Sequence, residues 1–199
     1  MTKLYIAFGS NLHKASMRVR APSAKPLGKF MLTKARLVFR GVADVEYDPE
    51  GKVPCGLWSI NQQDERNLDH YEGVKSGYYF KNEDIVLKYA GRPQNALIYL
   101  MRSEGIFPPS EHYVETIRKG YRDFGLDESY LDEAVERSFL DKNPDAQTIA
   151  RRKRQKNDRK HSKLTVMPES VALKKIELQR AQSWNDVREA LIETETEAS

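Results

Sequence analysis

Short apolar runs separated by turn-forming residues fill the first half of the chain, and they constrain its fold more than any other feature. In the first run, Leu4, Ile6 and Phe8 alternate with other residues before a break at Gly9-Ser10-Asn11. This period of two is typical of a β-strand that ends in a tight loop. Further runs that are apolar or alternating occupy residues 35–39, 55–60, 77–80, 85–89 and 96–101.

Three clusters of turn-forming residues divide these runs: Asp48-Pro49-Glu50-Gly51, Lys81-Asn82-Glu83-Asp84 and Gly91-Arg92-Pro93. Each combines glycine, proline, aspartate or asparagine, which are common in turns. Many short strands with few long helical periods between them favour a small mixed β-barrel over a doubly wound sheet. We therefore predict an α+β protein with a β-rich first half.

Helical periodicity becomes clear only after Pro108-Pro109. Ser110 is suited to cap a helix that ends at Gly125. Asp127 is suited to cap a second helix. The apolar residues expected on one face of these two helices are Tyr113, Ile117, Tyr121 and Phe124, followed by Leu131, Val135 and Phe139.

The apolar pattern stops after Asn143-Pro144. We therefore predict a main domain over residues 1–143, a basic linker or arm over 144–167, and a charged helical extension with an acidic end over 168–199. Periodic apolar residues in the last segment indicate one or two amphipathic helices.

Positive charge is concentrated in residues 151–163, which hold eight Lys or Arg and one Asp, a net of +7. The whole chain carries +4, so the remainder sums to −3. The basic segment has three interpretations: a solvated linker or helix face, an arm that binds nucleic acid, or a surface for an acidic partner. The segment contains no aromatic residue to stack on bases, which disfavours the nucleic-acid interpretation.

The only cysteine, Cys55, cannot form an intrachain disulfide and lies in an apolar run, so we expect it to be buried. The first residues, MTKLYIAFGS, lack the apolar stretch of a secretory signal, and no run is long enough for a membrane span. We therefore expect a cytoplasmic protein that has no contact with a membrane. The four histidines are scattered, and we assign no metal.

Two segments carry residues suited to chemistry. The loop Gly9-Ser10-Asn11-Leu12 follows the first strand, where backbone N–H groups are able to hold a carboxylate or an oxyanion. Glu72 stands at the end of a predicted short helix, before glycines and a new strand. Taken singly, the first pattern is a common turn and the second a common surface residue.

Four segments of the chain, FGSNL, CGLWSI, YEGVKSGYY and PPSEHYVETIRKG, resemble in this order the motifs of the γ-glutamylcyclotransferase or AIG2-like family. The resemblance runs from about Leu4 to Glu136. It implies a small closed mixed β-barrel with flanking helices, whose cavity receives a γ-glutamyl group. The residues that match the family's site are Glu72 as catalytic acid and base, and Phe8, Gly9, Ser10, Asn11, Leu12, Tyr79 and Tyr113 as substrate-binding residues. Many members have Tyr where this chain has Phe8.

The resemblance implies an enzyme in which the substrate's own α-amine attacks its γ-carbonyl carbon, releasing 5-oxoproline and a free amine. Such an internal reaction needs no cofactor, since it requires positioning and a proton shuttle. The small substrate remains open among γ-glutamyl amino acids, glutathione and γ-glutamylamines. The alternative is a binding module without catalysis, whose basic tail recognises nucleic acid or an acidic partner.

Overall fold

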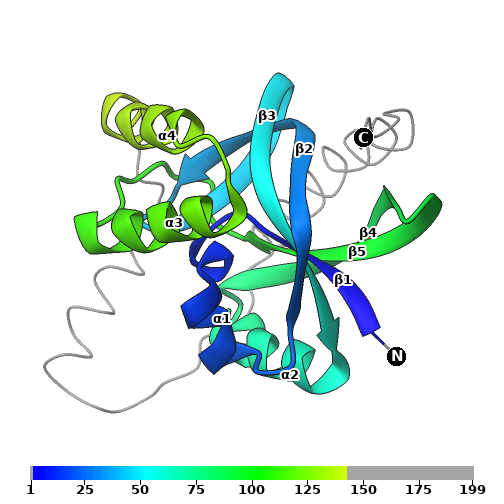
Figure 1. The fold of residues 1–199 in the computed structure, drawn as a ribbon. Helices are drawn as coiled ribbons and strands as arrows, with labels where there is room; N and C mark the ends of the chain where they lie inside the picture. The colour runs from blue at the N-terminus through cyan, green and yellow to red at the C-terminus, as the bar shows by residue number, and fades with distance from the viewer. Residues whose placement is uncertain (1, 143–199) are drawn as a thin grey trace, which may run out of the picture.

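The computed structural model describes residues 2–142 of the chain (Figure 1). The predicted basic segment and helical extension therefore lie outside the described residues. The helices and strands follow in the order β1 (Thr2–Ala7), η1 (Ser10–Leu12), α1 (Lys14–Arg20), β2 (Lys25–Phe39), β3 (Ala43–Asn61), α2 (Gln62–Tyr71), η2 (Val74–Ser76), β4 (Tyr79–Tyr89), β5 (Arg92–Met101), α3 (Glu111–Phe124) and α4 (Ser129–Leu140).

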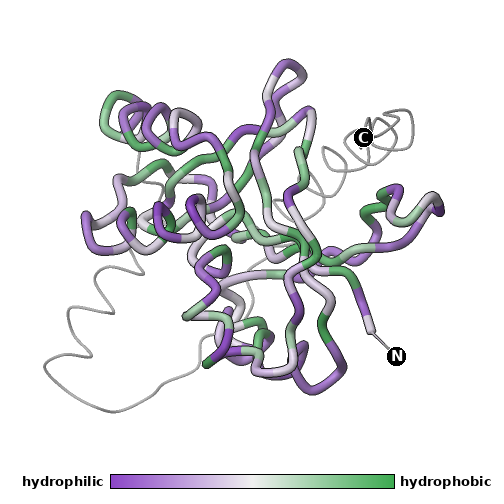
Figure 2. Tube along the Cα trace, in the orientation of Figure 1, coloured by the Kyte–Doolittle hydropathy of each residue, from purple (hydrophilic) through white to green (hydrophobic). Residues whose placement is uncertain are grey.

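Strand β1 lies at the centre of a mixed five-stranded sheet with the order β2-β3-β1-β5-β4. It pairs antiparallel with β3 and parallel with β5. Leu4, Tyr5, Ile6 and Ala7 are all buried, because both faces of β1 are covered. The apolar residues are concentrated at the centre of the sheet, where β3, β1 and β5 lie side by side (Figure 2).

The expected closure of the barrel is not confirmed. Strands β2 and β4 stand at the two edges of the sheet, and no ladder joins them within residues 2–142. The coarser prediction is confirmed, because the fold is a mixed α+β arrangement of a five-stranded sheet with flanking helices.

Two of the three predicted turns do not separate strands as expected, because their residues form bulges inside long strands. Residues 48–51 lie within β3, where the pairing steps from Ala35↔Tyr47 to Thr33↔Lys52 and leaves Lys34 alone opposite them. Residues 81–84 lie within β4 at a similar shift of register. Only the third signal forms a hairpin turn, between β4 and β5. A bulge accommodates turn-forming residues without ending the strand.

The late helices agree with the sequence prediction except at one end. Ser110 caps α3 by accepting a hydrogen bond from the backbone of Tyr113, and Asp127 accepts one from the backbone of Ser129 at the start of α4. Phe139, however, is 62% exposed, because the last turn of α4 extends beyond the sheet. Helix α1 was missed, since Met17 is its only buried residue and gives no periodic signal.

Helix α3 packs with its backbone directly against η1, the short 3₁₀ turn after β1. Leu12 is fully buried there, between Gly56 of β3 and Gly120 of α3. A Cβ atom built on Gly120 would lie 2.4 Å from the Cβ of Leu12 and 2.6 Å from the backbone nitrogen of His13. Only glycine permits this approach, so Gly120 fixes the position of the loop that precedes Leu12.

We therefore expect Gly120→Ala to destabilise the protein by roughly 1–3 kcal/mol, the usual cost of overpacking. Alanine forms helices better than glycine, so a helix free of this contact would instead gain stability. Urea denaturation measures the difference. Lys119→Ala, at the exposed neighbouring position of α3, is the control and should change stability by less than about 0.5 kcal/mol. A Gly120→Ala protein as stable as the wild type would contradict the close packing.

Candidate active site

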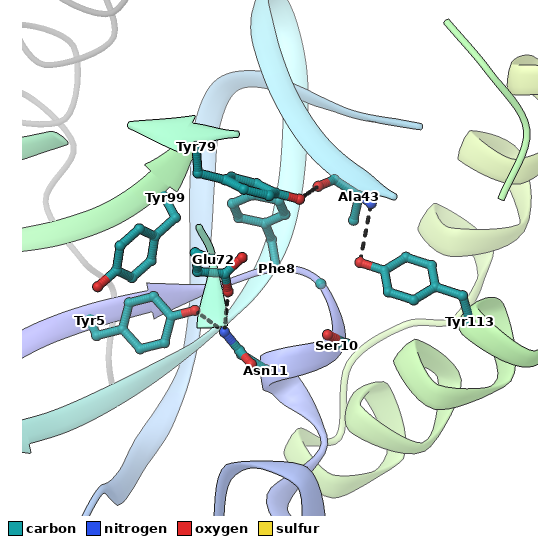
Figure 3. Close-up of a pocket in the computed structure, with 10 residues that line it drawn as sticks. Tyr5, Phe8, Ser10, Asn11, Ala43, Glu72, Tyr79, Tyr99 and Tyr113 are labelled. Carbon is teal, nitrogen blue, oxygen red and sulfur yellow. Dashed lines mark hydrogen bonds between the residues drawn. The ribbon is translucent and has the colours of Figure 1, made fainter. Parts of the chain in front are cut away.

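The ends of several elements converge on a pocket of about 310 Å³ (Figure 3). Six of the elements described above contribute to it, from β1 to α3. The residues that line it are Tyr5, Phe8, Gly9, Ser10, Asn11, Ala43, Glu72, Tyr79, Tyr99 and Tyr113.

Glu72 is held at the C-terminal end of α2. A capping box of Asn61 and Asp64 fixes the start of this helix. At its end, the N–H of Glu72 donates to the carbonyl of Leu68 at 2.8 Å. Gly73 and Gly77 then adopt left-handed conformations, with φ of 67° and 72°, and lead the chain through η2 into β4. The segment thus sets a carboxylate beside the strand that carries Tyr79.

The carboxyl group of Glu72 titrates near neutrality. Burial in the pocket raises its pKa to about 7, although a hydrogen bond from Asn11 and the positive charge of Arg20 both lower it. The Nδ2 atom of Asn11 donates to Oε1 of Glu72 at 2.7 Å. A carboxyl group with this pKa is able both to accept and to release a proton at physiological pH.

The side chain of Asn11 is buried, and both the nitrogen and the oxygen of its amide form hydrogen bonds. Its Nδ2 donates to the hydroxyl of Tyr5 at 2.7 Å as well as to Glu72. Its Oδ1 accepts from Nη1 of Arg20 at 2.6 Å. The same Nη1 donates to Oγ of Ser10 at 3.0 Å. The amide therefore connects the loop after β1 to the carboxylate at the end of α2.

The loop also presents unpaired backbone donors. The N–H of Leu12 donates to the carbonyl of Gly9 at 2.9 Å and closes the turn. The N–H groups of Gly9, Ser10 and Asn11 donate no hydrogen bond within the part of the chain that the structure describes. Unpaired N–H groups in a pocket wall are suited to bind a carboxylate or an oxyanion.

Two tyrosines from distant elements meet at one backbone position. The N–H of Ala43, the first residue of β3, donates to the hydroxyl of Tyr113 at 3.2 Å. The carbonyl of the same residue accepts from the hydroxyl of Tyr79 at 3.3 Å. Burial raises the pKa of Tyr113 to about 12, so its phenol stays neutral at physiological pH.

A second aromatic pair forms another wall. The rings of Tyr5 and Tyr99 meet edge to face, with centroids 5.7 Å apart. The hydroxyl of Tyr99 donates to Oδ1 of Asp69 at 2.7 Å, which fixes that ring from outside the pocket. Burial raises the pKa of both phenols.

Seven of the eight residues predicted for the site lie together in this pocket. The exception is Leu12, whose side chain is in the core and whose N–H closes the turn. Sequence reasoning missed three lining residues, Tyr5, Ala43 and Tyr99, and the supporting Arg20. Tyr5 gave one signal, since it is a polar aromatic residue within the run that precedes the loop.

The other candidates from the sequence lie elsewhere. Cys55 is fully buried, and burial raises the pKa of its thiol, which makes it a poor nucleophile. Within residues 2–142, no group of three or more His, Cys, Asp or Glu side chains is placed to hold a metal ion. None of the helices described in this range combines the length and the apolar character needed to cross a membrane.

Comparison with known proteins identifies similar sequences and folds. Residues 52–133 match the model of the AIG2-like family. The chain is 31% identical to the gamma-glutamylcyclotransferase of Mus musculus over 65% of this chain and 75% of that protein, and 32% identical to that of Homo sapiens over 64% and 74%. A solved structure of a gamma-glutamyl cyclotransferase shares the fold, with a TM-score of 0.58, 23% identity, and coverage of 90% of this chain and 99% of the other.

The raised pKa of Glu72 predicts a specific dependence of stability on pH. The pKa rises on folding from 4.5 to about 7, so between these values the folded protein holds a proton that the unfolded chain has released. The contribution of Glu72 to the free energy of unfolding therefore falls as the pH rises through this range. Glu72→Gln should remove this decrease in the free energy of unfolding, because glutamine does not titrate.

We expect Glu72→Gln to gain stability relative to the wild type between pH 5 and pH 8, by up to roughly 3 kcal/mol. Urea denaturation at both pH values measures the change. Glu111→Gln, which alters an exposed carboxylate on α3, should show the same difference from the wild type at both. A pH-independent difference for Glu72→Gln would show that the carboxyl group titrates normally.

Proposed function

The chain belongs to the γ-glutamylcyclotransferase family and is an enzyme of that family, and from this premise we propose that it cleaves a γ-glutamyl amide by internal cyclisation, releasing 5-oxoproline and a free amine. One observation carries the proposal. The pocket places a carboxyl group whose pKa is about 7 together with a loop of unpaired backbone donors. These are the proton shuttle and the anion site that the reaction requires.

In the first step, Glu72 takes a proton from the substrate's α-ammonium group. The freed amine then attacks the γ-carbonyl carbon and closes a five-membered ring, while the carbonyl oxygen becomes an oxyanion. Holding the substrate in this folded conformer provides much of the acceleration, since effective molarities for such reactions reach roughly 10⁵–10⁸ M.

In the second step, the tetrahedral intermediate collapses and the bond to the leaving nitrogen breaks. Glu72, now protonated, gives its proton to that nitrogen and then takes the second proton from the ring nitrogen, which becomes a neutral lactam. This proton passes to the released amine, which departs as an ammonium ion, so the carboxylate is restored and no water is consumed. One carboxyl group serves both steps because its pKa lies close to physiological pH. The neutral phenols of Tyr5, Tyr99 and Tyr113 line the pocket around the reacting groups.

The substrate presents two anionic groups to the loop, the α-carboxylate throughout and the oxyanion transiently. We assign both to the N–H groups of Gly9, Ser10 and Asn11, since these donors are unpaired within residues 2–142. Phe8 lines the same pocket without a hydroxyl, so it offers only apolar contact to the substrate. Release of 5-oxoproline from γ-glutamyl amino acids, glutathione and γ-glutamylamines would identify which of them is the substrate.

The alternative of a binding module without catalysis finds no support in residues 2–142, where the pocket and Glu72 are in place. Recognition of nucleic acid or an acidic partner by residues 151–163 stays a prediction from the sequence, because that segment lies outside the described residues. A cytoplasmic location is likewise a prediction from the sequence.

Glu72→Gln should lower turnover by about 10²–10⁴-fold, because a general acid and base typically contributes this much. The measurement is release of 5-oxoproline from a panel of γ-glutamyl amides, with the folded state checked by circular dichroism. Glu111→Gln should keep wild-type turnover. Undiminished release by a folded Glu72→Gln protein would remove Glu72 from the mechanism.

Substitutions in the loop should separate backbone from hydroxyl chemistry. A Cβ atom on Gly9 would lie 3.1 Å from the Cβ of Ala43 and 3.3 Å from the hydroxyl of Tyr113, so Gly9→Val forces a branched side chain into the pocket. Ser10→Ala removes one acceptor of Arg20 and leaves the backbone donors unchanged. We expect Gly9→Val to abolish activity and Ser10→Ala to be mild. The reverse order would assign the substrate contact to the serine hydroxyl.

A further inference from the structure

Arg20 does not line the pocket, yet it contacts the residues that organise it. Its Nη1 donates to Oδ1 of Asn11 and to Oγ of Ser10. Its guanidinium stacks on the ring of Tyr71, 3.9 Å from the centroid. Tyr71 precedes Glu72 in the chain, so one cation connects α1, the loop after β1 and the end of α2.

We propose that Arg20 is a positioning residue that locks the amide of Asn11, so that Asn11 occupies Oε1 of Glu72 and leaves Oε2 as the oxygen that transfers the proton. This inference rests on the proposed function. It adds which oxygen of the Glu72 carboxyl group transfers the proton, and it names Arg20 as the residue that determines this.

The orientation of the Asn11 amide follows from its three partners. A guanidinium only donates, so the amide oxygen must face Arg20 and the amide nitrogen must face Glu72 and Tyr5. If the amide turned over, its oxygen would face a carboxylate oxygen and its NH₂ group would face the guanidinium. Removing Arg20 removes the only cation among these partners, so the amide oxygen loses its donor and the amide is held through its nitrogen alone.

Oε2 of Glu72 has no hydrogen-bond partner within residues 2–142, whereas Oε1 is taken by Asn11 (Figure 3). An oxygen that already accepts a short hydrogen bond is the poorer base, because a proton added there would displace the donor. The two atoms of one carboxyl group are therefore made unequal by a residue that touches neither of them.

The kinetic consequence has a definite sign. The groups that surround Glu72 in the pocket are the phenols of Tyr5 on β1, Tyr79 on β4, Tyr99 on β5 and Tyr113 on α3, and the cation of Arg20 on α1 lies behind Asn11. Burial raises the pKa of Tyr5, Tyr99 and Tyr113 and keeps these three phenols neutral. Arg20 and the Asn11 bond both favour ionised Glu72, so loss of Arg20 should move the acid limb of the pH–kcat profile to higher pH.

The test is a double-mutant cycle of Arg20→Met and Asn11→Ala, with kcat, KM and the pH profile of 5-oxoproline release measured for each protein. Arg20→Met alone should lower kcat by about 10–10²-fold, as displacement of a reacting group does. It should also shift the acid limb upward. In the Asn11→Ala background, Arg20→Met should have little further effect on kcat, because its action runs through that amide. Arg18→Met, at an exposed position of the same helix, is the control.

Additive effects, or a rise in KM with kcat and the acid limb unchanged, would overturn the inference and make Arg20 a substrate-binding or purely structural residue. If Arg20→Met fails to fold, Arg20→Gln replaces it, since it removes the charge and retains a donor. The pKa of the Glu72 carboxyl, followed by ¹³C NMR without substrate, should rise in either variant; an unchanged value would also overturn the inference. Failure of Glu72→Gln to lower turnover would instead reject the proposed function, so the two failures are distinguishable.

Discussion

The burial of Leu12 between two glycines is the contact on which the pocket depends. A loop with unpaired N–H groups has little reason of its own to hold one conformation, because its donors are equally well satisfied by water. Here the side chain that ends the loop is inserted between β3 and α3, and Gly56 and Gly120 let both elements approach it closely. The core thus provides the rigidity, and the donors remain free for a ligand. Leu12 serves the site although it does not line the pocket.

The pKa of Glu72 arises from opposing contributions, of which burial is the largest. Aromatic walls and burial disfavour its charge, while Asn11 and Arg20 favour it, and the balance lies near neutral pH. Burial alone would leave the group protonated and unable to act as a base. Stronger pairing would leave it ionised and a poor acid. The supporting amide and cation therefore help to set the pH range over which the carboxyl group changes its charge.

The parts of the fold written in local patterns were predictable from the sequence, and the parts set by distant pairing were not. The strand from Leu4 to Phe8 was recognisable by its period of two, and the helix from Ser110 to Gly125 by its helical period and its capping residues. The turn-forming residues at 48–51 predicted the end of a strand but form a bulge within β3, because the outcome depends on the pairing with the partner strand. Glu72 and most of its neighbours followed from the family resemblance. Tyr99 and Arg20 join the site only through the pairing of β1 with β5 and the packing of α1, which no spacing along the chain encodes.

The main chain of Ala43 anchors the hydroxyls of Tyr79 and Tyr113, one from β4 and the other from α3. These two walls therefore share a single reference point, and they cannot move apart without breaking bonds to the same residue. Because the anchoring atoms belong to the backbone, a substitution at position 43 does not by itself remove either hydrogen bond. Substitution of the rings that face the pocket is therefore expected to change the range of substrates. The spacing between the two walls is instead determined by the backbone at the start of β3.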